Sequence, residues 1–205
     1  MSLKKSFVSF LLFIVFQPLH AEPWKVLESA QATDVAEGKI EVVEVFWYGC
    51  PHCYDFEPFL EEWLDNKADD VEFKRMPGIF RENWIPHARA YYTALELGVL
   101  DAVHRPMFEA IHKHRQQLSS QSQLRKLFAE NGVDEDAFDG AYESESVTDK
   151  VKKALLMGRR YEIRGVPSIV VNGKYLTGAS IAGSFANMLK ATDELVARER
   201  AQQGQ

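Results

Sequence analysis

The segment Glu-Val-Val-Glu-Val-Phe-Trp-Tyr-Gly-Cys-Pro-His-Cys at residues 41–53 carries the strongest structural signal in this chain of 205 residues. β-branched and aromatic side chains over 41–47 predict a short, buried strand. Pro51 suits the first turn of a helix because its ring fixes φ, and apolar residues recur over 56–64 at the spacing of an amphipathic helix. The segment therefore predicts a strand that passes through a turn into a helix, with two cysteines where they meet.

The chain that follows alternates between strand and helix patterns. Residues 70–76 alternate apolar and polar side chains and predict a second strand. From 83 to 161 the apolar residues recur at helical spacing, which predicts a block of short helices. We expect breaks in this block at Gly98, Pro106, Ser119-Ser120 and Asn131-Gly132.

The C-terminal part returns to β structure. Residues 168–171 and 174–176 flank Asn172-Gly173, which predicts a hairpin with a two-residue turn. Apolar residues over 181–196 predict a closing helix, and we expect a frayed polar tail from Arg198 to Gln205. The two β-rich ends are expected to form one unit that the helical block interrupts.

Composition and charge exclude several classes of protein. Hydrophobic residues make up 46% of the chain and charged residues 26%, which is typical of a globular domain and not of a fibrous or disordered chain. Twenty-four basic against 30 acidic residues give a formal charge of −6, without a block of Lys and Arg. Nucleic-acid binding and a polybasic membrane patch therefore have little support.

The first 21 residues have the order of a secretory signal peptide. Lys4 and Lys5 precede an apolar stretch at 7–16, and Ala21 suits the cleavage site. Ten helical residues span only about 15 Å, which is half of a hydrocarbon core, so stable membrane insertion is not expected. We expect an exported mature chain from residue 22, with 22 basic and 30 acidic residues. Its two cysteines would then reside where a disulfide persists.

The pair Cys50 and Cys53 points to redox chemistry. A thiolate at a helix N-terminus faces unpaired N–H groups, so the pKa of Cys50 should fall, while Cys53 is placed to close a disulfide with it. His52 favours the Cys50 thiolate by charge or by hydrogen bonding. A stabilised thiolate stabilises the reduced form, so the disulfide would be an oxidant.

Other uses of these residue types have less support. A zinc site needs about four ligands, and no second cysteine pair accompanies this one; a structural disulfide closing so short a loop would restrict the unfolded chain little. Two further groups are expected to be solvated, namely the glutamates of the first helix (Glu57, Glu61, Glu62) and the histidine pair (His112, His114).

With Arg164-Gly-Val-Pro167 and Asn172-Gly-Lys-Tyr175, the cysteine motif resembles the DsbA-type thiol-disulfide oxidoreductases of bacterial periplasms, and the resemblance extends over 24–197. It implies an α/β chain with a thioredoxin-like fold and an inserted helical domain. The expected division is a signal peptide at 1–21, a first thioredoxin-like part at 22–80, the insertion at 81–161 and a second part at 162–205.

The resemblance also implies roles for single residues. Cys50 corresponds to the attacking cysteine and Cys53 to its partner, with Pro51 and His52 supporting them. Pro167 corresponds to a cis-proline that exposes the backbone of Val166 to an extended substrate.

Glu44 resembles a buried acid that assists proton transfer, opposite a basic residue that is Arg75 here and often Lys in the family. Because Arg stays charged, an ordinary buried ion pair is an equal alternative to a proton-shuttling pair.

The expected function is an exported dithiol oxidase that needs no metal or organic cofactor. It would pass the Cys50–Cys53 disulfide to reduced, unfolded or partly folded exported proteins in the periplasm, as a monomer, and a membrane quinone-linked DsbB-type partner would reoxidise it. The alternatives are an isomerase or reductase on the same fold, a non-catalytic peptide-binding or chaperone module with a structural disulfide, and, with less support, a kappa-type glutathione transferase.

Overall fold

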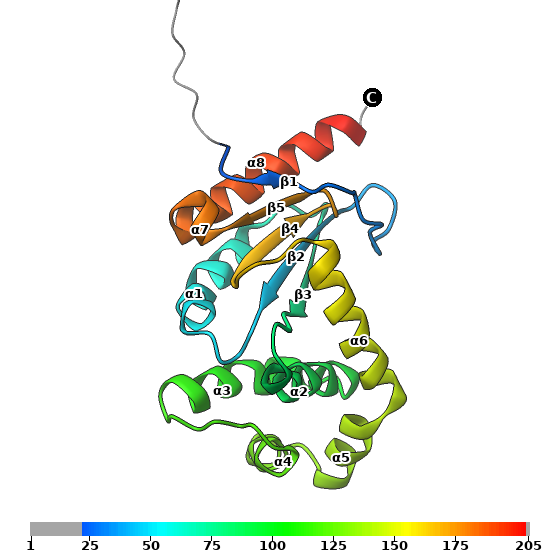
Figure 1. Ribbon diagram of the computed structural model, residues 1–205, viewed down its shortest axis with the longest axis vertical. Coiled ribbons are helices and arrows are strands. Elements are labelled where there is room, and N and C mark those ends of the chain that lie inside the picture. The colour runs from blue at the N-terminus through cyan, green and yellow to red at the C-terminus, as the bar shows by residue number, and fades with distance from the viewer. Residues whose placement is uncertain (1–21, 204–205) are drawn as a thin grey trace, which may run out of the picture.

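The computed structural model describes residues 22–203, so the predicted signal peptide lies outside the described residues. Five strands form one sheet in the order β1-β5-β4-β2-β3 (Figure 1). The strands are β1 (Lys25–Val26), β2 (Ile40–Phe46), β3 (Val71–Pro77), β4 (Ser168–Val171) and β5 (Tyr175–Gly178). The sheet thus joins the two ends of the chain, as the sequence predicts. Strand β1 was not predicted from the sequence.

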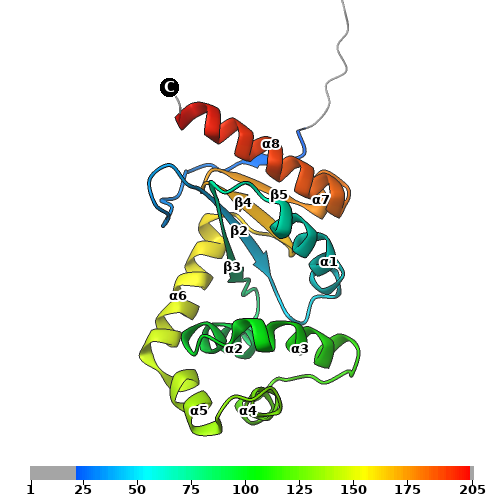
Figure 2. The same cartoon turned by 180° about the vertical axis from the view of Figure 1, so that it is seen from behind.

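The helices lie on both faces of the sheet and beyond one of its ends (Figures 1 and 2). They are α1 (Pro51–Asn66), η1 (Glu82–Trp84), α2 (Ile85–Glu96), α3 (Leu100–His112), α4 (Gln121–Glu130), α5 (Glu135–Glu143), α6 (Glu145–Arg160), α7 (Ala179–Ala182) and α8 (Phe185–Gln203). Helices α1 and α8 share a buried cluster with one face of the sheet. The block from α2 to α6 separates β3 from β4 in sequence, which confirms the predicted run of helices.

Strand pairing explains why α1 lies where it does. Strands β2 and β3 are parallel, with Glu44 opposite Arg75, and a parallel pair needs a crossover connection that α1 provides. Strand β4 runs antiparallel to both β2 and β5. Because β2 is paired on both sides, with β3 and β4, and is buried along its whole length, the turn after it is held firmly at the end of the sheet.

The predicted hairpin is present between β4 and β5. Asn172 and Gly173 both have positive φ, at 49° and 62°, and the N–H of Lys174 donates to the carbonyl of Val171 over 3.0 Å. This is the turn geometry that favours Asn-Gly. A Cβ on Gly173 would lie 2.2 Å from the carbonyl oxygen of Gln31, so the position also requires glycine for space.

Two local predictions are wrong. Pro106 does not break a helix but lies inside α3, where burial of Val103, Met107 and Phe108 on either side of it outweighs one missing backbone hydrogen bond. The predicted frayed tail is helical up to Gln203.

The helical tail is held by side-chain contacts that cross the fold. Glu199 is only 1% exposed, and its carboxylate accepts hydrogen bonds from Asn172 and from Lys174 of the hairpin. Arg200 donates to Asp70 over 2.7 Å. These contacts explain why a polar segment stays ordered against the sheet.

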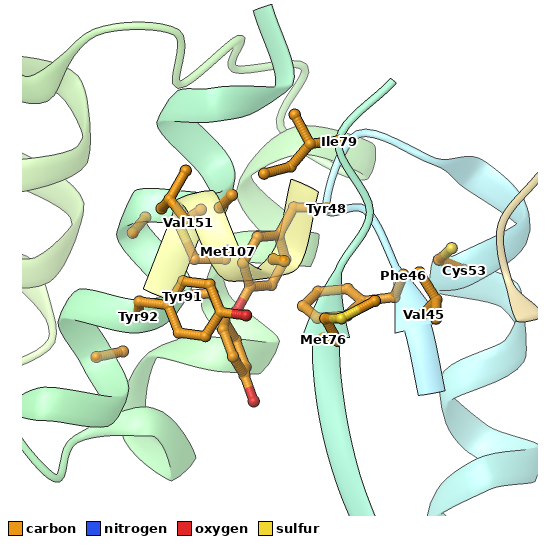
Figure 3. Close-up of a cluster of buried hydrophobic side chains, with 14 of the residues drawn as sticks. Val45, Phe46, Tyr48, Cys53, Met76, Ile79, Tyr91, Tyr92, Met107 and Val151 are labelled. Carbon is orange, nitrogen blue, oxygen red and sulfur yellow. The ribbon is translucent and has the colours of Figure 1, made fainter. Parts of the chain in front are cut away.

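One apolar cluster runs from the sheet into the helical block (Figure 3). Phe46 at the end of β2 packs edge-on against Tyr48 and Tyr91, with ring centroids 5.0 and 5.4 Å apart. Met107 of α3 belongs to the same cluster and is fully buried. The helical block is therefore packed directly against the turn that carries the cysteines.

Candidate active site

The two cysteines lie where β2 passes into α1. The N–H of Cys50 donates to the carbonyl of Trp47 over 2.9 Å, and Cys50 then caps the helix in an extended conformation. A Cβ on Gly49 would fall 2.3 Å from the Trp47 ring, so the turn needs glycine there. Cys53 lies one helical turn further on and is fully buried, whereas Cys50 is 8% exposed.

The surroundings give the two thiols opposite acidities. The pKa of Cys50 is lowered to about 6, chiefly by a hydrogen bond from the Cys53 thiol and then, against the effect of burial, by the N–H groups of Cys53 and His52 and the charge of His52. Burial raises the pKa of Cys53 well above its usual range. In the reduced state Cys50 is therefore the more acidic thiol, and Cys53 holds its proton.

A proline loop faces the reactive sulfur. The Val166–Pro167 peptide bond is cis, as the family resemblance implies, and the Cys50 Sγ lies 3.4 Å from the carbonyl oxygen of Val166. A hollow of ≈ 520 Å³ opens beside this loop, lined by the loop itself, by the exposed His52 and by the apolar ring of Phe185. An extended chain lying along this loop would pass directly beside Cys50.

A buried charge cluster lies beneath the cysteines. Arg75 Nε donates to Glu44 over 2.9 Å and its terminal nitrogen donates to Glu57 over 3.2 Å. Burial raises the pKa of Glu44 to about 8, although the charge of Arg75 opposes this. The predicted pairing of Glu44 with Arg75 is present, and a second carboxylate shares the guanidinium.

Glu57 corrects a prediction, because it is only 7% exposed and does not face solvent. Its carboxylate also lies 3.4 Å from Nε2 of His104. The sequence contains the signal, since Glu57 follows Cys53 by four residues and precedes Leu60 by three, which places it on the buried face of the helix.

Two histidines of α3 hold Tyr48 in the turn before the cysteines. Nδ1 of His104 is 2.8 Å from the Tyr48 hydroxyl, and Nε2 of His112 donates to the Tyr48 carbonyl over 2.8 Å. His112 also stacks on Tyr54 at 5.0 Å, so the prediction that it is merely solvated is wrong. No feature of the sequence shows that residues more than 50 positions apart would meet here.

Among residues 22–203, no helix is long and apolar enough to cross a membrane. Nor do three or more His, Cys, Asp or Glu side chains gather there in a way that could hold a metal ion.

Comparison with known proteins agrees with the site. Residues 75–190 match the DSBA-like thioredoxin domain. The chain is 43% identical over 166 residues to the thiol:disulfide interchange protein DsbA of Azotobacter vinelandii, covering 81% of this chain and 78% of that protein. It is 38% identical over 179 residues to the protein of the same name from Burkholderia cepacia, covering 87% and 84% respectively.

Solved structures support the same assignment. The crystal structure of Pseudomonas aeruginosa DsbA matches with a TM-score of 0.85 and 38% identity, over 90% of this chain and 95% of that one. The names of these relatives give no support to an isomerase or a non-catalytic chaperone. Fold, extent of similarity and the cysteine motif agree, and the chain belongs to the DsbA family of thiol:disulfide interchange proteins.

Proposed function

We propose that the chain oxidises reduced proteins by donating a Cys50–Cys53 disulfide. The observation that carries this proposal is the contrast between the thiols, because the pKa of Cys50 is lowered to about 6 while that of the buried Cys53 is raised. A thiolate of low pKa is a good leaving group and stabilises the reduced enzyme. Both effects favour transfer of the disulfide from the enzyme to the substrate.

The reaction consists of two exchanges. A substrate thiolate attacks Cys50 Sγ of the disulfide, a substrate–Cys50 bond forms, and the Cys50–Cys53 bond breaks with its electron pair on Cys53. A second substrate thiolate then attacks the substrate sulfur of the mixed disulfide, and Cys50 leaves as a thiolate. The substrate dithiol loses two electrons and two protons. The cysteine pair gains both electrons, Cys53 takes up one proton, and the other proton goes to solvent because Cys50 stays a thiolate.

Val166 and Pro167 supply the docking edge in this proposal. The Val166 carbonyl, 3.4 Å from Cys50 Sγ, can accept a backbone hydrogen bond from an extended substrate segment. Recognition through the main chain suits a catalyst whose substrates differ in sequence. The adjoining hollow at His52 and Phe185 takes the apolar side chains of that segment.

Glu44 is proposed to take up or supply the Cys53 proton. A carboxyl group whose pKa is about 8 is mostly protonated at neutral pH and exchanges its proton near that pH. Arg75 stays charged throughout and balances the carboxylate when it forms. Pro51 fixes the first turn of α1, and His52 supports the Cys50 thiolate by its charge.

Similarity to the DsbA family supports a proposal for the partners and the compartment. We propose that the mature chain acts in the periplasm as a monomer on unfolded or partly folded exported proteins, and that a membrane quinone-linked DsbB-type protein restores its disulfide. The sheet-forming parts, residues 22–80 and 162–205, are proposed as one thioredoxin-like unit around the insertion at 81–161. No metal or organic cofactor enters the proposed exchange.

Trapping of the mixed disulfide tests the proposal. Cys53→Ala should accumulate a disulfide with a one-cysteine peptide supplied as its thionitrobenzoate disulfide: the Cys50 thiolate attacks the peptide sulfur, thionitrobenzoate leaves, and no Cys53 thiol remains to release the peptide. Cys50→Ala should neither trap that peptide nor oxidise a reduced two-cysteine peptide. Oxidation at the wild-type rate by Cys50→Ala would refute the assignment.

A further inference from the structure

A second hollow shares no lining residue with the one at His52. Its volume is ≈ 530 Å³, and its walls come from the β3–α2 connection and the end of α6. Its lining includes the apolar residues Phe80, Leu155 and Ile163, here called the floor, and the exposed Arg81 and Arg159, here called the rim. Phe80 and Leu155 are 42% and 38% exposed, so apolar surface is open to a ligand.

The hollow is continuous with the edge proposed to bind substrate. The β3–α2 connection begins at Gly78, where even an added Cβ would come within 3.2 Å of a Val166 methyl group, so this connection packs on Val166 itself. Ile79, the next residue, lies at the end of the apolar cluster in Figure 3. Ile163 in the floor precedes Val166 by three residues, about 10 Å of extended chain. A substrate strand beside Val166 would reach the hollow two to four residues from its reacting cysteine.

The positive charges of the two rim arginines favour a ligand that carries a carboxylate. Among the described residues, neither Arg81 nor Arg159 has a carboxylate within ion-pair distance, although ion pairs are common elsewhere on this surface, as at Arg105 with Glu61. Glu82 is the one acidic residue in the lining, against two arginines. The predicted mature chain carries 22 basic and 30 acidic residues, so the charge of this basic rim is opposite in sign to the net charge of the chain.

We infer that this hollow is a second substrate subsite, which receives a large apolar side chain next to a carboxylate in the segment flanking the substrate cysteine. The inference rests on the proposed function and adds to it a preference among substrates. Guanidinium groups suit the carboxylate because they donate two parallel hydrogen bonds. The apolar floor buries the neighbouring side chain.

Peptide kinetics test the inference. Two-cysteine peptides that differ only in Phe-Glu against Phe-Gln, two to four residues before or after the reacting cysteine, are oxidised with glutathione disulfide as the oxidant. At low salt the wild-type chain should show a lower KM for the Glu peptide on one side of the cysteine, by about two- to fivefold per arginine, with kcat unchanged. Raising the salt concentration should reduce the preference.

Matched variants assign the effect to the rim. The double variant Arg81→Gln/Arg159→Gln should lose the preference, whereas Arg160→Gln, the same change at an exposed neighbour outside the lining, should keep it. Equal KM values for both peptides in the wild type, or a preference that survives the double variant, would overturn the inference while leaving the oxidase intact. Failure to oxidise any peptide would instead refute the proposed function.

Discussion

Replacing Cys53 tests the cause of the Cys50 acidity. The first contribution to the lowered pKa of Cys50, about 6, is the hydrogen bond from the Cys53 thiol. A hydrogen bond to a charged group contributes about 1.5–3 kcal/mol, which corresponds to about one to two pKa units. Cys53→Ala should therefore raise the Cys50 pKa to about 7–8, and the thiolate fraction at pH 7 should fall from about nine-tenths to between one-half and one-tenth.

Cys53→Ser is the matched control because a hydroxyl keeps the donor while removing the thiol. Its Cys50 pKa should rise less than that of Cys53→Ala. The pKa is measured by the ultraviolet absorbance of the thiolate during a pH titration, and independently by the pH dependence of alkylation with iodoacetamide. An unchanged pKa in Cys53→Ala, or an equal rise in both variants, would refute the assignment of the shift to this hydrogen bond.

Three further changes probe other parts of the account. His52→Ala should raise the Cys50 pKa in the same titration, but by less than Cys53→Ala, because the charge of His52 lowers that pKa less than the Cys53 hydrogen bond does; a larger rise would reverse that order. Burial raises the pKa of Glu44 from 4.5 to about 8, so its contribution to stability is fully present below pH 4.5 and is lost as the pH rises through about 8. In urea unfolding, Glu44→Gln should therefore gain stability relative to wild type between about pH 5 and pH 8, and a pH-independent difference would contradict the raised pKa. Gly173→Ala should lower the free energy of unfolding by about 1–3 kcal/mol, since its Cβ would lie 2.2 Å from a backbone oxygen, whereas Gly140→Ala, with open space around it, should not; equal effects would argue against a steric cause.

Features set by neighbouring residues were predictable from the sequence. The strand, turn and helix around Cys50 and the hairpin at Asn172-Gly173 follow from periodicity and turn preferences that act over a few residues. The placement of Pro167 beside the cysteines came from resemblance to a family, because no local signal connects residues more than 100 positions apart. The cis bond before Pro167 was likewise predicted only from that resemblance.

Features set by distant contacts were missed. Strand β1 has only two residues, too few for any period, and exists because it pairs with β5. His104 and His112 gained roles only when α3 packed against the turn at Tyr48. Glu57 could have been found, since helical spacing places it on the buried face, but its polar side chain suggested solvent.

The reduction potential of the cysteine pair decides whether this chain is an oxidant, as we propose. Compared with a reactive thiol of pKa about 7, as in thioredoxin, a Cys50 pKa of about 6 stabilises the reduced form about fivefold at pH 7, or about 20 mV for two electrons. Equilibration with glutathione at pH 7 should give a potential at least that far above the roughly −270 mV of thioredoxin, and the potential should fall by about 30 mV per pH unit between about pH 6 and pH 8, because one proton accompanies two electrons. A potential at or below that of thioredoxin, or a slope of about 59 mV per pH unit, would contradict the account.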